Sequence, residues 1–371
     1  MTSVDSRAAQ AAKAQLSHFR ERIDNQISLF LDEACAYLAS IGPELHPVSE
    51  AMRNFLTDGG KRFRPLLGVI GSLSVENHLD SPRSDIPSDA TIKACASLEF
   101  LHACALIHDD VMDGSDTRRG NPSIHRHFES IHRSDGLAGA SSKYGEASAI
   151  LLGDLALIWA DLILHRSGLA SEALLAVLPI YDELRVELMA GQYLDVHEQS
   201  LATADPARSL KVANYKSGKY SIERPLHFGA RIAGGDDSLL AALSAYGIPV
   251  GEAFQLRDDI LGVFGDPTET GKPAGDDLRE GKRTVLMAFA MERAPQSAKE
   301  LLKRVGDPDL DQESIEKLRE VIISSGALSR VEEMISTRSE QAHLALESER
   351  IAPGAKPLLQ LMAHMALVRN H

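Results

Sequence analysis

Apolar residues recur at steps of three and four along most of the chain, and this periodicity constrains the fold more than any other feature. The first segment of this kind has apolar side chains at Leu16, Phe19, Ile23, Ile27, Phe30 and Leu31. That spacing puts them on one face of an α-helix. Alternating patterns typical of strands are scarce, and aromatic residues make up only 5% of the chain. The sequence therefore predicts an all-α protein.

Stretches rich in Gly, Pro, Ser and Asp interrupt the helical pattern at residues 78–89, 134–146, 203–208 and 264–282. Such residues favour turns or compete for helix hydrogen bonds, and none of these stretches resembles a long flexible linker. The chain also shows no repeat of fixed period. We therefore expect one helical domain over residues 1–371.

The overall charge and the cysteines exclude several functional classes. A formal net charge of -14 repels polyanions, so broad nucleic-acid binding is not expected. Cys35, Cys95 and Cys104 form no CxxC spacing, which argues against a disulfide framework or a zinc site and favours a reducing cytoplasm. No run of about 18 apolar residues is visible, so neither export nor a membrane span is indicated.

The segment FLHACALIHDDVMD carries the first acidic cluster, formed by Asp109, Asp110 and Asp113. On a helix Asp109 and Asp113 are i and i+4, so their carboxylates project to the same side and repel unless a cation lies between them. Mg2+ is usually held by one or two carboxylates together with phosphate oxygens. Arg118 and Arg119 follow closely, and arginine suits a bidentate grip on phosphate. A solvated acidic helix end is the alternative interpretation.

A second acidic pair lies about 150 residues later in the segment GEAFQLRDDILGVFGDP. It contains Gln255, Asp258 and Asp259, again at the end of an apolar segment. Two Asp pairs at the ends of apolar helices are much stronger evidence than one, because facing helices in a bundle commonly build metal sites in this way.

Basic residues stand near both acidic clusters. Upstream, GGKRFRP brings Lys61, Arg62 and Arg64 together, either as a surface patch or as ligands of a second anionic group. Further lysines near the later motifs are Lys216, Lys219, Lys272 and Lys282.

Taken in order, the GGKRFRP, HDDVMD, RRG, FQLRDDILGVFGDP and GKP segments resemble the polyprenyl (trans-isoprenyl) diphosphate synthases. The resemblance spans Gly59 to Thr284. It implies a single large helical bundle of the isoprenoid synthase type with a central apolar pocket. It also implies Mg2+ as cofactor (three ions), isopentenyl diphosphate and allylic diphosphates as substrates, and a homodimer.

The resemblance assigns roles to residues that match the family's motifs. Asp109 and Asp113 would bind two Mg2+ ions and Asp258 a third, with Asp110 and Asp259 in support. Contacts to the allylic diphosphate would come from Arg118, Lys216, Ser217, Gln255, Lys272 and Lys282, with Lys216 also counted as catalytic. The isopentenyl diphosphate site would be formed by Lys61, Arg64, His102 and Arg119. Gly262 stands where the family usually has the last aspartate of the second motif, so we expect this motif to lack one carboxylate.

Product length is expected to depend on the helix that ends in the first acidic cluster. Cys104 and Ala105 lie one turn before Asp109. In the family an aromatic residue here stops synthesis near fifteen carbons, so these small residues predict a deeper pocket with Leu101 and Leu98 as its floor. Geranylgeranyl diphosphate is therefore the expected main product, unless other helices set the floor.

Three other functions stay open at this point. A farnesyl diphosphate synthase would differ only in product length. A class I terpene cyclase shares the acidic metal site, but it binds one diphosphate and has no need for GGKRFRP. A regulatory subunit of a heteromeric synthase usually has eroded acidic motifs, whereas here only the last position of the second motif has changed.

Overall fold

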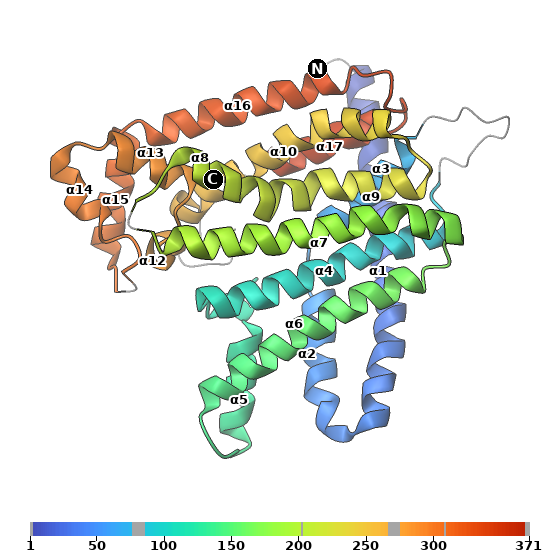
Figure 1. The fold of residues 1–371 in the computed structure, drawn as a ribbon, viewed down its shortest axis with the longest axis horizontal. Coiled ribbons are helices and arrows are strands. Elements are labelled where there is room, and N and C mark those ends of the chain that lie inside the picture. The colour runs from blue at the N-terminus through green and yellow to red at the C-terminus, as the bar shows by residue number, and fades with distance from the viewer. Residues whose placement is uncertain (1–2, 76–85, 202, 266–274, 308, 368–371) are drawn as a thin grey trace. The chain divides into compact units, whose positions relative to one another are not determined.

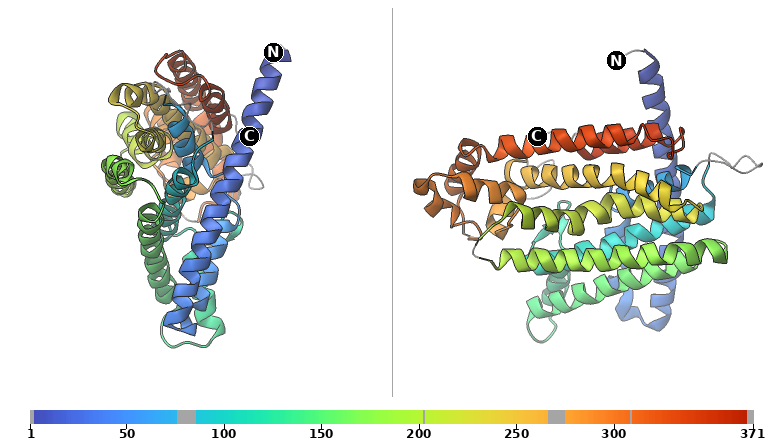
Figure 2. Two further views of the ribbon diagram at one scale, coloured as in Figure 1. Left: turned by 90° about the vertical axis from the view of Figure 1, so that its right-hand side faces the viewer. Right: turned by 45° about the horizontal axis from the view of Figure 1, so that its top comes forward.

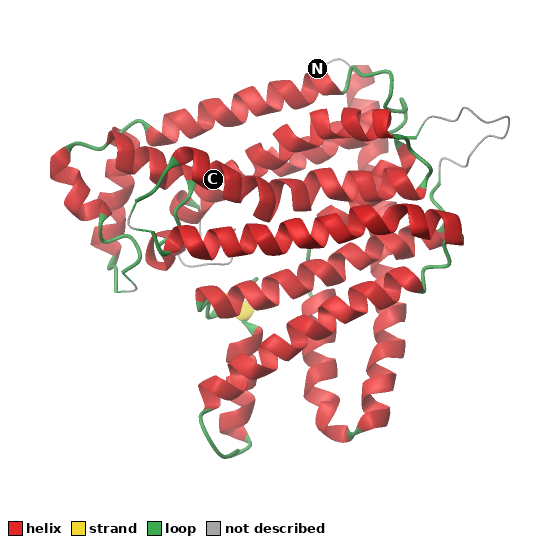
Figure 3. Cartoon of the chain, in the orientation of Figure 1, coloured by secondary structure: helices red, strands yellow, loops and turns green. Residues whose placement is uncertain are grey.

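The computed structural model describes residues 3–75, 86–201, 203–265, 275–307 and 309–367. Helices dominate these ranges, as Figure 3 shows, and the strands among the described residues form a single short hairpin. The prediction of an all-α protein is confirmed. The chain divides into two compact units: the first takes in the residues up to Leu73, the segment that ends at Ala176, and Phe228–Gly234, and the second takes in the remainder. A single domain stays a prediction.

The first unit is organised around helix α4 (Asp89–Asp113), which packs against α1 (Ser3–Ile41), α3 (Phe63–Leu73) and α6 (Ser141–His165). α1 and α2 form a helical hairpin (Figures 1 and 2). The other elements of this unit are η1 (Pro43–Leu45), α2 (His46–Thr57), β1 (Thr117–Arg118), β2 (Asn121–Pro122) and α5 (Ile124–Ser134).

The core of the first unit follows the sequence pattern. All six periodic apolar positions between Leu16 and Leu31 are buried on α1. Phe30, Phe100 and Trp159 meet edge to face, with ring centroids 5.0 to 6.4 Å apart, and so join α1, α4 and α6. Such pairs stabilise by about 0.5–1.5 kcal/mol each beyond the area they bury. α4 is thereby held along the length that leads to its acidic end.

The second unit is organised around α10 (Asp237–Phe264), which packs against η2 (Ala213–Glu223), α16 (Ala327–Ala345) and α17 (Lys356–Leu367). Figure 2 shows α10 running alongside α16. Two helices continue from one unit into the other, α7 (Ser171–Gln199) and α9 (Arg224–Ile232). The remaining elements are α8 (Pro206–Val212), α12 (Asp276–Glu280), α13 (Val285–Arg293), α14 (Gln296–Leu302) and α15 (Gln312–Ser324).

The η2 segment is a π-helix, a rare geometry that is often found at functional sites. Its backbone is pressed against both neighbours. A Cβ on Gly251 of α10 would lie 2.6 Å from the Cα of Gly218, and a Cβ on Gly191 of α7 would lie 2.4 Å from the backbone nitrogen of Lys216. Only glycine allows so close an approach. These contacts fix the backbone that carries Lys216 and Ser217.

The expectation that no segment is apolar enough to cross a membrane needs correction. Among the described residues α4, α6 and α10 are long and apolar enough to do so by length and composition. The shares of their most apolar windows that are buried within the protein are 72%, 44% and 56%. Packing within each unit thus covers much of the apolar surface that composition alone assigns to a membrane.

Candidate active site

The first acidic cluster occupies the last five residues of α4, which ends at Asp113 and is capped by Gly114 in the left-handed region (φ 67°). The C-terminal end of a helix carries partial negative charge, so carboxylates there are electrostatically unfavourable. The negative charges of Asp109, Asp110 and Asp113 therefore destabilise this end of the helix. A bound cation would offset this repulsion.

The β hairpin returns Arg118 to the end of α4. Its central residues Arg119 and Gly120 have φ values of 54° and 80°, as a type I′ turn requires. Arg118 Nε donates to both oxygens of Asp110, at 2.9 and 3.1 Å, and Nη2 donates to Oδ1. Asp110 is fully buried, so its carboxylate holds the guanidinium in place. This arrangement supports the auxiliary role that the resemblance implies for Asp110.

Arg62, in the GGKRFRP segment, is an internal brace. It is 3% exposed and donates to Asp24 at 2.6 Å, to Glu99 at 2.7 Å and to the carbonyl oxygen of Leu56 at 2.6 Å. Burial would lower the pKa of Arg62, but the two carboxylates outweigh burial and raise it. The role of Arg62 is therefore to hold the GGKRFRP segment in place.

Its neighbours are placed differently. Lys61 is exposed and Arg64 is partly buried, as a ligand contact would require. A Cβ on Gly60 (φ 94°) would lie only 3.0 Å from Arg62 Nη1, which explains the glycine. In the described ranges, the non-glycine residues with positive φ are Arg62 and Arg119. Both belong to this basic region, and backbone strain of this kind is often kept at binding sites.

His102, on α4, stands among the cations of this region. Burial and the positive charges of four arginines hold the pKa of His102 well below its usual range. These are Arg64, Arg119, Arg118 and Arg62. The imidazole is consequently neutral near pH 7, and it can donate one hydrogen bond to an anion without adding to the repulsion. The first unit thus brings Arg64 and Arg119, predicted for the isopentenyl diphosphate site, close to His102.

The second acidic pair lies near the end of α10. Asp259 is buried and accepts a hydrogen bond from Gln255 Nε2 at 2.8 Å. Burial, together with the negative charges of Asp277 and Asp258, raises the pKa of Asp259 to about 7, although Gln255 and the Val285 backbone oppose the shift. Gln255 thus contacts Asp259, and the supporting role implied for Asp259 stays a prediction. A contact of Gln255 with substrate stays a prediction.

Two of the predicted lysines of the second unit lie among the described residues, and each contacts a carboxylate. Lys216 Nζ lies 2.6 Å from Asp195 of α7, and Lys282 Nζ lies 2.7 Å from Glu280. Ser217 is half-buried beside Lys216 on η2. Lys272 lies outside the described residues.

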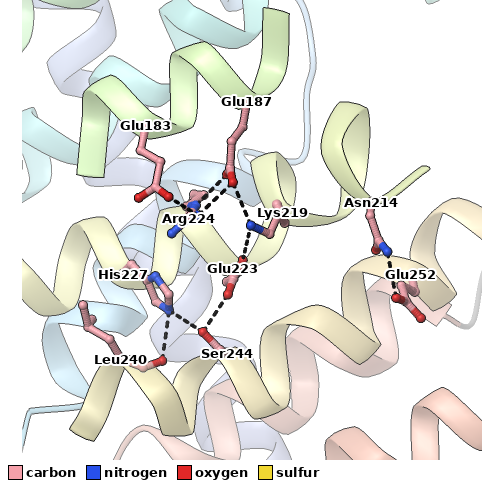
Figure 4. A network of polar contacts seen from close by, with 10 residues as sticks. All are labelled: Glu183, Glu187, Asn214, Lys219, Glu223, Arg224, His227, Leu240, Ser244 and Glu252. Carbon is pink, nitrogen blue, oxygen red and sulfur yellow. Dashed lines mark hydrogen bonds and ion pairs between the residues drawn. The ribbon is translucent and has the colours of Figure 1, made fainter. Parts of the chain in front are cut away.

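A polar network secures the end of η2, as Figure 4 shows. Glu187 of α7 accepts hydrogen bonds from Arg224 and, at 2.7 Å, from Lys219. Burial would raise the pKa of Glu187, but these hydrogen bonds outweigh burial and lower it. Glu223 accepts from Ser244 at 2.6 Å. The network ties α7, η2, α9 and α10 together around the segment that carries Lys216.

The residues proposed to set product length lie on the buried part of α4. Leu101 and Cys104 are fully buried and Ala105 is partly buried. Cys104 Sγ lies 3.8 Å from His108 Nδ1, and the His108 ring fills the space over Gly153 of α6. Burial, with a contribution from Asp154, raises the pKa of the Cys104 thiol to about 12. The Cys104 thiol is therefore unreactive near pH 7.

The donor chemistry of both clusters suits Mg2+. In the described ranges no three His, Cys, Asp or Glu side chains are grouped closely enough to hold a metal by themselves. Mg2+ does not need such a cage, because one or two carboxylates and substrate phosphates suffice. Asp109 and Asp113 supply hard oxygen atoms at one helix end, and Asp258 supplies one at another. These residues fit the ion.

Several residues that shape the site escaped the sequence interpretation. Asp24 and Glu99 hold Arg62, and Asp195 holds Lys216. The partners are 21 to 38 residues apart in the chain, so no local spacing reveals them. The sequence did contain one indication of such a partner, because Glu99 is an acidic residue within an apolar helical segment.

One cavity lies apart from all predicted site residues. It has a volume of about 350 Å³ in the second unit, between α8, α13 and α16. Its lining is mainly apolar and includes Leu210, Phe289 and Met334. The central apolar pocket implied by the resemblance stays a prediction.

Comparisons with known proteins identify the family. Residues 46–322 match the polyprenyl synthetase family. The structure is similar to that of a geranylgeranyl pyrophosphate synthase from Corynebacterium glutamicum, complexed with isoprenyl diphosphate and magnesium, with 40% identity, a TM-score of 0.91, and coverage of 96% of this chain and 99% of that one. A geranylfarnesyl diphosphate synthase from Aeropyrum pernix is 30% identical over 90% of this chain and 97% of its own length.

A geranylgeranyl diphosphate synthase from Sulfolobus acidocaldarius is 29% identical over 83% of this chain and 85% of its own length. These matches identify the protein as a trans-prenyltransferase. The chain belongs to the polyprenyl synthetase family, and its activity is that of a trans-prenyl diphosphate synthase.

Proposed function

We propose that the protein is a Mg2+-dependent prenyltransferase that condenses isopentenyl diphosphate with dimethylallyl, geranyl and farnesyl diphosphates, giving chiefly geranylgeranyl diphosphate. The observation that carries this proposal is the composition of the first unit. It combines an acidic helix end, suited to a metal-bound diphosphate, with a neutral His102 among four arginines, suited to a second diphosphate. A terpene cyclase needs only the first of these.

The residues divide the work in the reaction. Asp109, Asp113 and Asp258 would hold Mg2+, which when bound would stabilise the charge that develops on the leaving diphosphate. Arg118, fixed by Asp110, and the lysines Lys216, Lys272 and Lys282 would bind the same diphosphate, with Ser217 and Gln255 nearby. Lys61, Arg64, His102 and Arg119 would hold isopentenyl diphosphate.

In the condensation the allylic carbon–oxygen bond breaks, and diphosphate leaves with the bonding electrons. The double bond of isopentenyl diphosphate then attacks the allylic cation and forms the new carbon–carbon bond. Loss of a proton, taken up by the released diphosphate, restores a double bond. Preorganised cations favour this sequence because they stabilise the charge that develops on the leaving group.

The proposed product length depends on Cys104, Ala105 and Leu101. Small side chains at the first two positions leave room for a twenty-carbon chain, with Leu101 as the floor. Relatives make products of several lengths, since their names include geranylgeranyl, geranylfarnesyl and nonaprenyl diphosphate synthases. We expect Cys104→Phe to shorten the product, and Cys95→Phe, at a buried position farther from the acidic cluster, is the comparison variant.

The test is direct. Purified protein is incubated with labelled isopentenyl diphosphate, each allylic primer and Mg2+, and the products are separated by chain length. Twenty-carbon product that requires Mg2+ supports the proposal. Cyclised product without consumption of isopentenyl diphosphate would indicate a terpene cyclase, and elongation only with a partner chain would indicate a regulatory subunit.

A homodimer in the cytoplasm completes the proposal. On α6 the exposed residues Tyr144, Leu151 and Ile158 are seven apart and share one helix face. A second copy of the chain would cover this apolar stripe. Ile158→Glu should shift the mass measured by light scattering from dimer to monomer, whereas Glu146→Gln on the same helix should not.

A further inference from the structure

Gly262 is the one motif position at which the chain departs from the family's second acidic motif, and the structure shows what occupies its place. A Cβ on Gly262 would lie 1.8 Å from Oδ2 and 2.4 Å from Cγ of Asp277. Gly262 has ordinary helical φ within α10, so no backbone requirement explains the glycine. The glycine instead leaves space for the Asp277 side chain.

Asp277 is well placed for a role beside the second motif. It lies on α12, its side chain is only 14% exposed, and its carboxylate rests against the turn of α10 that follows Asp258 and Asp259. The missing aspartate would have stood on that same turn. The number of carboxylates at the motif is therefore preserved, although one of them comes from another helix.

The same residue orders a proposed diphosphate contact. Lys282 Nζ lies 2.7 Å from Glu280 and 3.7 Å from Asp277 Oδ1, and the backbone nitrogen of Lys282 donates to the carbonyl oxygen of Asp277 at 3.1 Å. Between them Gly281 (φ 75°) makes the turn, and a Cβ there would lie 2.8 Å from the Cα of Gly306. The segment from Asp277 to Lys282 thus packs against α10 at the position where Gly262 leaves room for the Asp277 side chain.

We propose that Gly262 and Asp277 act as a pair: the glycine makes room for the Asp277 carboxylate, which replaces the absent aspartate of the second motif and positions Lys282 for diphosphate. This inference rests on the proposed function. It reverses the sequence expectation that the motif is short of one carboxylate.

The pair can be tested through binding of inorganic diphosphate with Mg2+, measured by isothermal titration calorimetry. Asp277→Asn, which keeps the shape, and Gly262→Ala, which displaces only a side-chain carboxylate, should each weaken binding by about 10- to 100-fold, as outer-shell changes at metal sites do. The double variant should lose no more than the worse single variant. Gly354→Ala, where a Cβ meets nothing within 4 Å, is the matched control.

The decisive variant is Gly262→Asp, which restores the family pattern. We expect it to bind magnesium diphosphate more weakly than the wild type, because two carboxylates are forced into one space, and we expect the added change Asp277→Ala to recover binding. Tighter binding by Gly262→Asp, or wild-type binding by folded Asp277→Asn, would overturn the inference. Failure of the proposed function looks different, since the wild type itself would then elongate no allylic diphosphate.

Discussion

The two regions that carry the acidic motifs differ in the charges that surround their carboxylates. At the end of α4 Arg118 from the neighbouring hairpin balances the charge of Asp110, and further arginines surround His102 on the same helix. Near the end of α10 carboxylates gather instead, and Asp259 depends on Gln255 and a backbone amide. The buried carboxylate of the first motif is therefore balanced by a positive charge, whereas that of the second is held by neutral donors beside other carboxylates.

This difference indicates how each region depends on its ligands. In the cationic region four arginines surround an imidazole that burial and their charges hold neutral, which favours an incoming diphosphate. The anionic region has more negative charge than its own cations balance, which favours an incoming metal ion.

The largest expected effect follows from removing one proposed metal ligand from each region. We expect Asp109→Asn to lower kcat/KM by at least about 100- to 1,000-fold, because stabilisation of the leaving diphosphate is lost. Asp258→Asn should have a smaller effect if the first motif dominates. Equal losses, measured in the elongation assay at saturating Mg2+, would contradict this ranking.

The next largest expected effect is a loss of stability in the region of the first motif. Arg118→Gln leaves the buried Asp110 carboxylate without its guanidinium, and breaking such a pair costs about 3–5 kcal/mol. The double variant Asp110→Asn/Arg118→Gln should recover much of this loss. Lys317→Gln, which breaks an exposed pair with Glu313, should leave the free energy of unfolding nearly unchanged.

Sequence patterns predicted the elements better than the contacts between them. The α1 periodicity identified six buried positions, and both Asp pairs lie near helix ends as expected. Local spacing carries this information because a helix repeats every 3.6 residues.

Contacts between distant segments have no such repeat. The partners Arg62 and Glu99 are 37 residues apart, and Gly262 and Asp277 belong to different helices. From the sequence alone, Arg62 was therefore interpreted as one more cation of a basic patch, and Gly262 as the loss of an acidic ligand. Their roles follow from packing, which brings a buried carboxylate to the first and fills the space beside the second.

The anionic region should reveal itself in a pH dependence. Because the pKa of Asp259 rises from 3.8 to about 7 on folding, the folded state binds a proton that the unfolded state has lost between these values. Its contribution to stability is fully present below about pH 4 and is lost as the pH rises through about 7. Without Mg2+, Asp259→Asn should flatten this part of the profile in denaturant titrations; an unchanged slope would place the shift elsewhere.

The cationic region should show the opposite dependence, and with the smallest effect. The pKa of His102 is lowered on folding from 6.5, so the unfolded state takes up a proton first as the pH falls. Stability should therefore decline below about pH 6.5, by at most about 1.4 kcal/mol per pH unit for one proton. His102→Gln keeps a hydrogen-bond donor and should remove this slope, whereas His165→Gln, outside the cluster, should retain it. If both variants keep the wild-type slope, His102 is not the group that the surrounding arginines hold neutral.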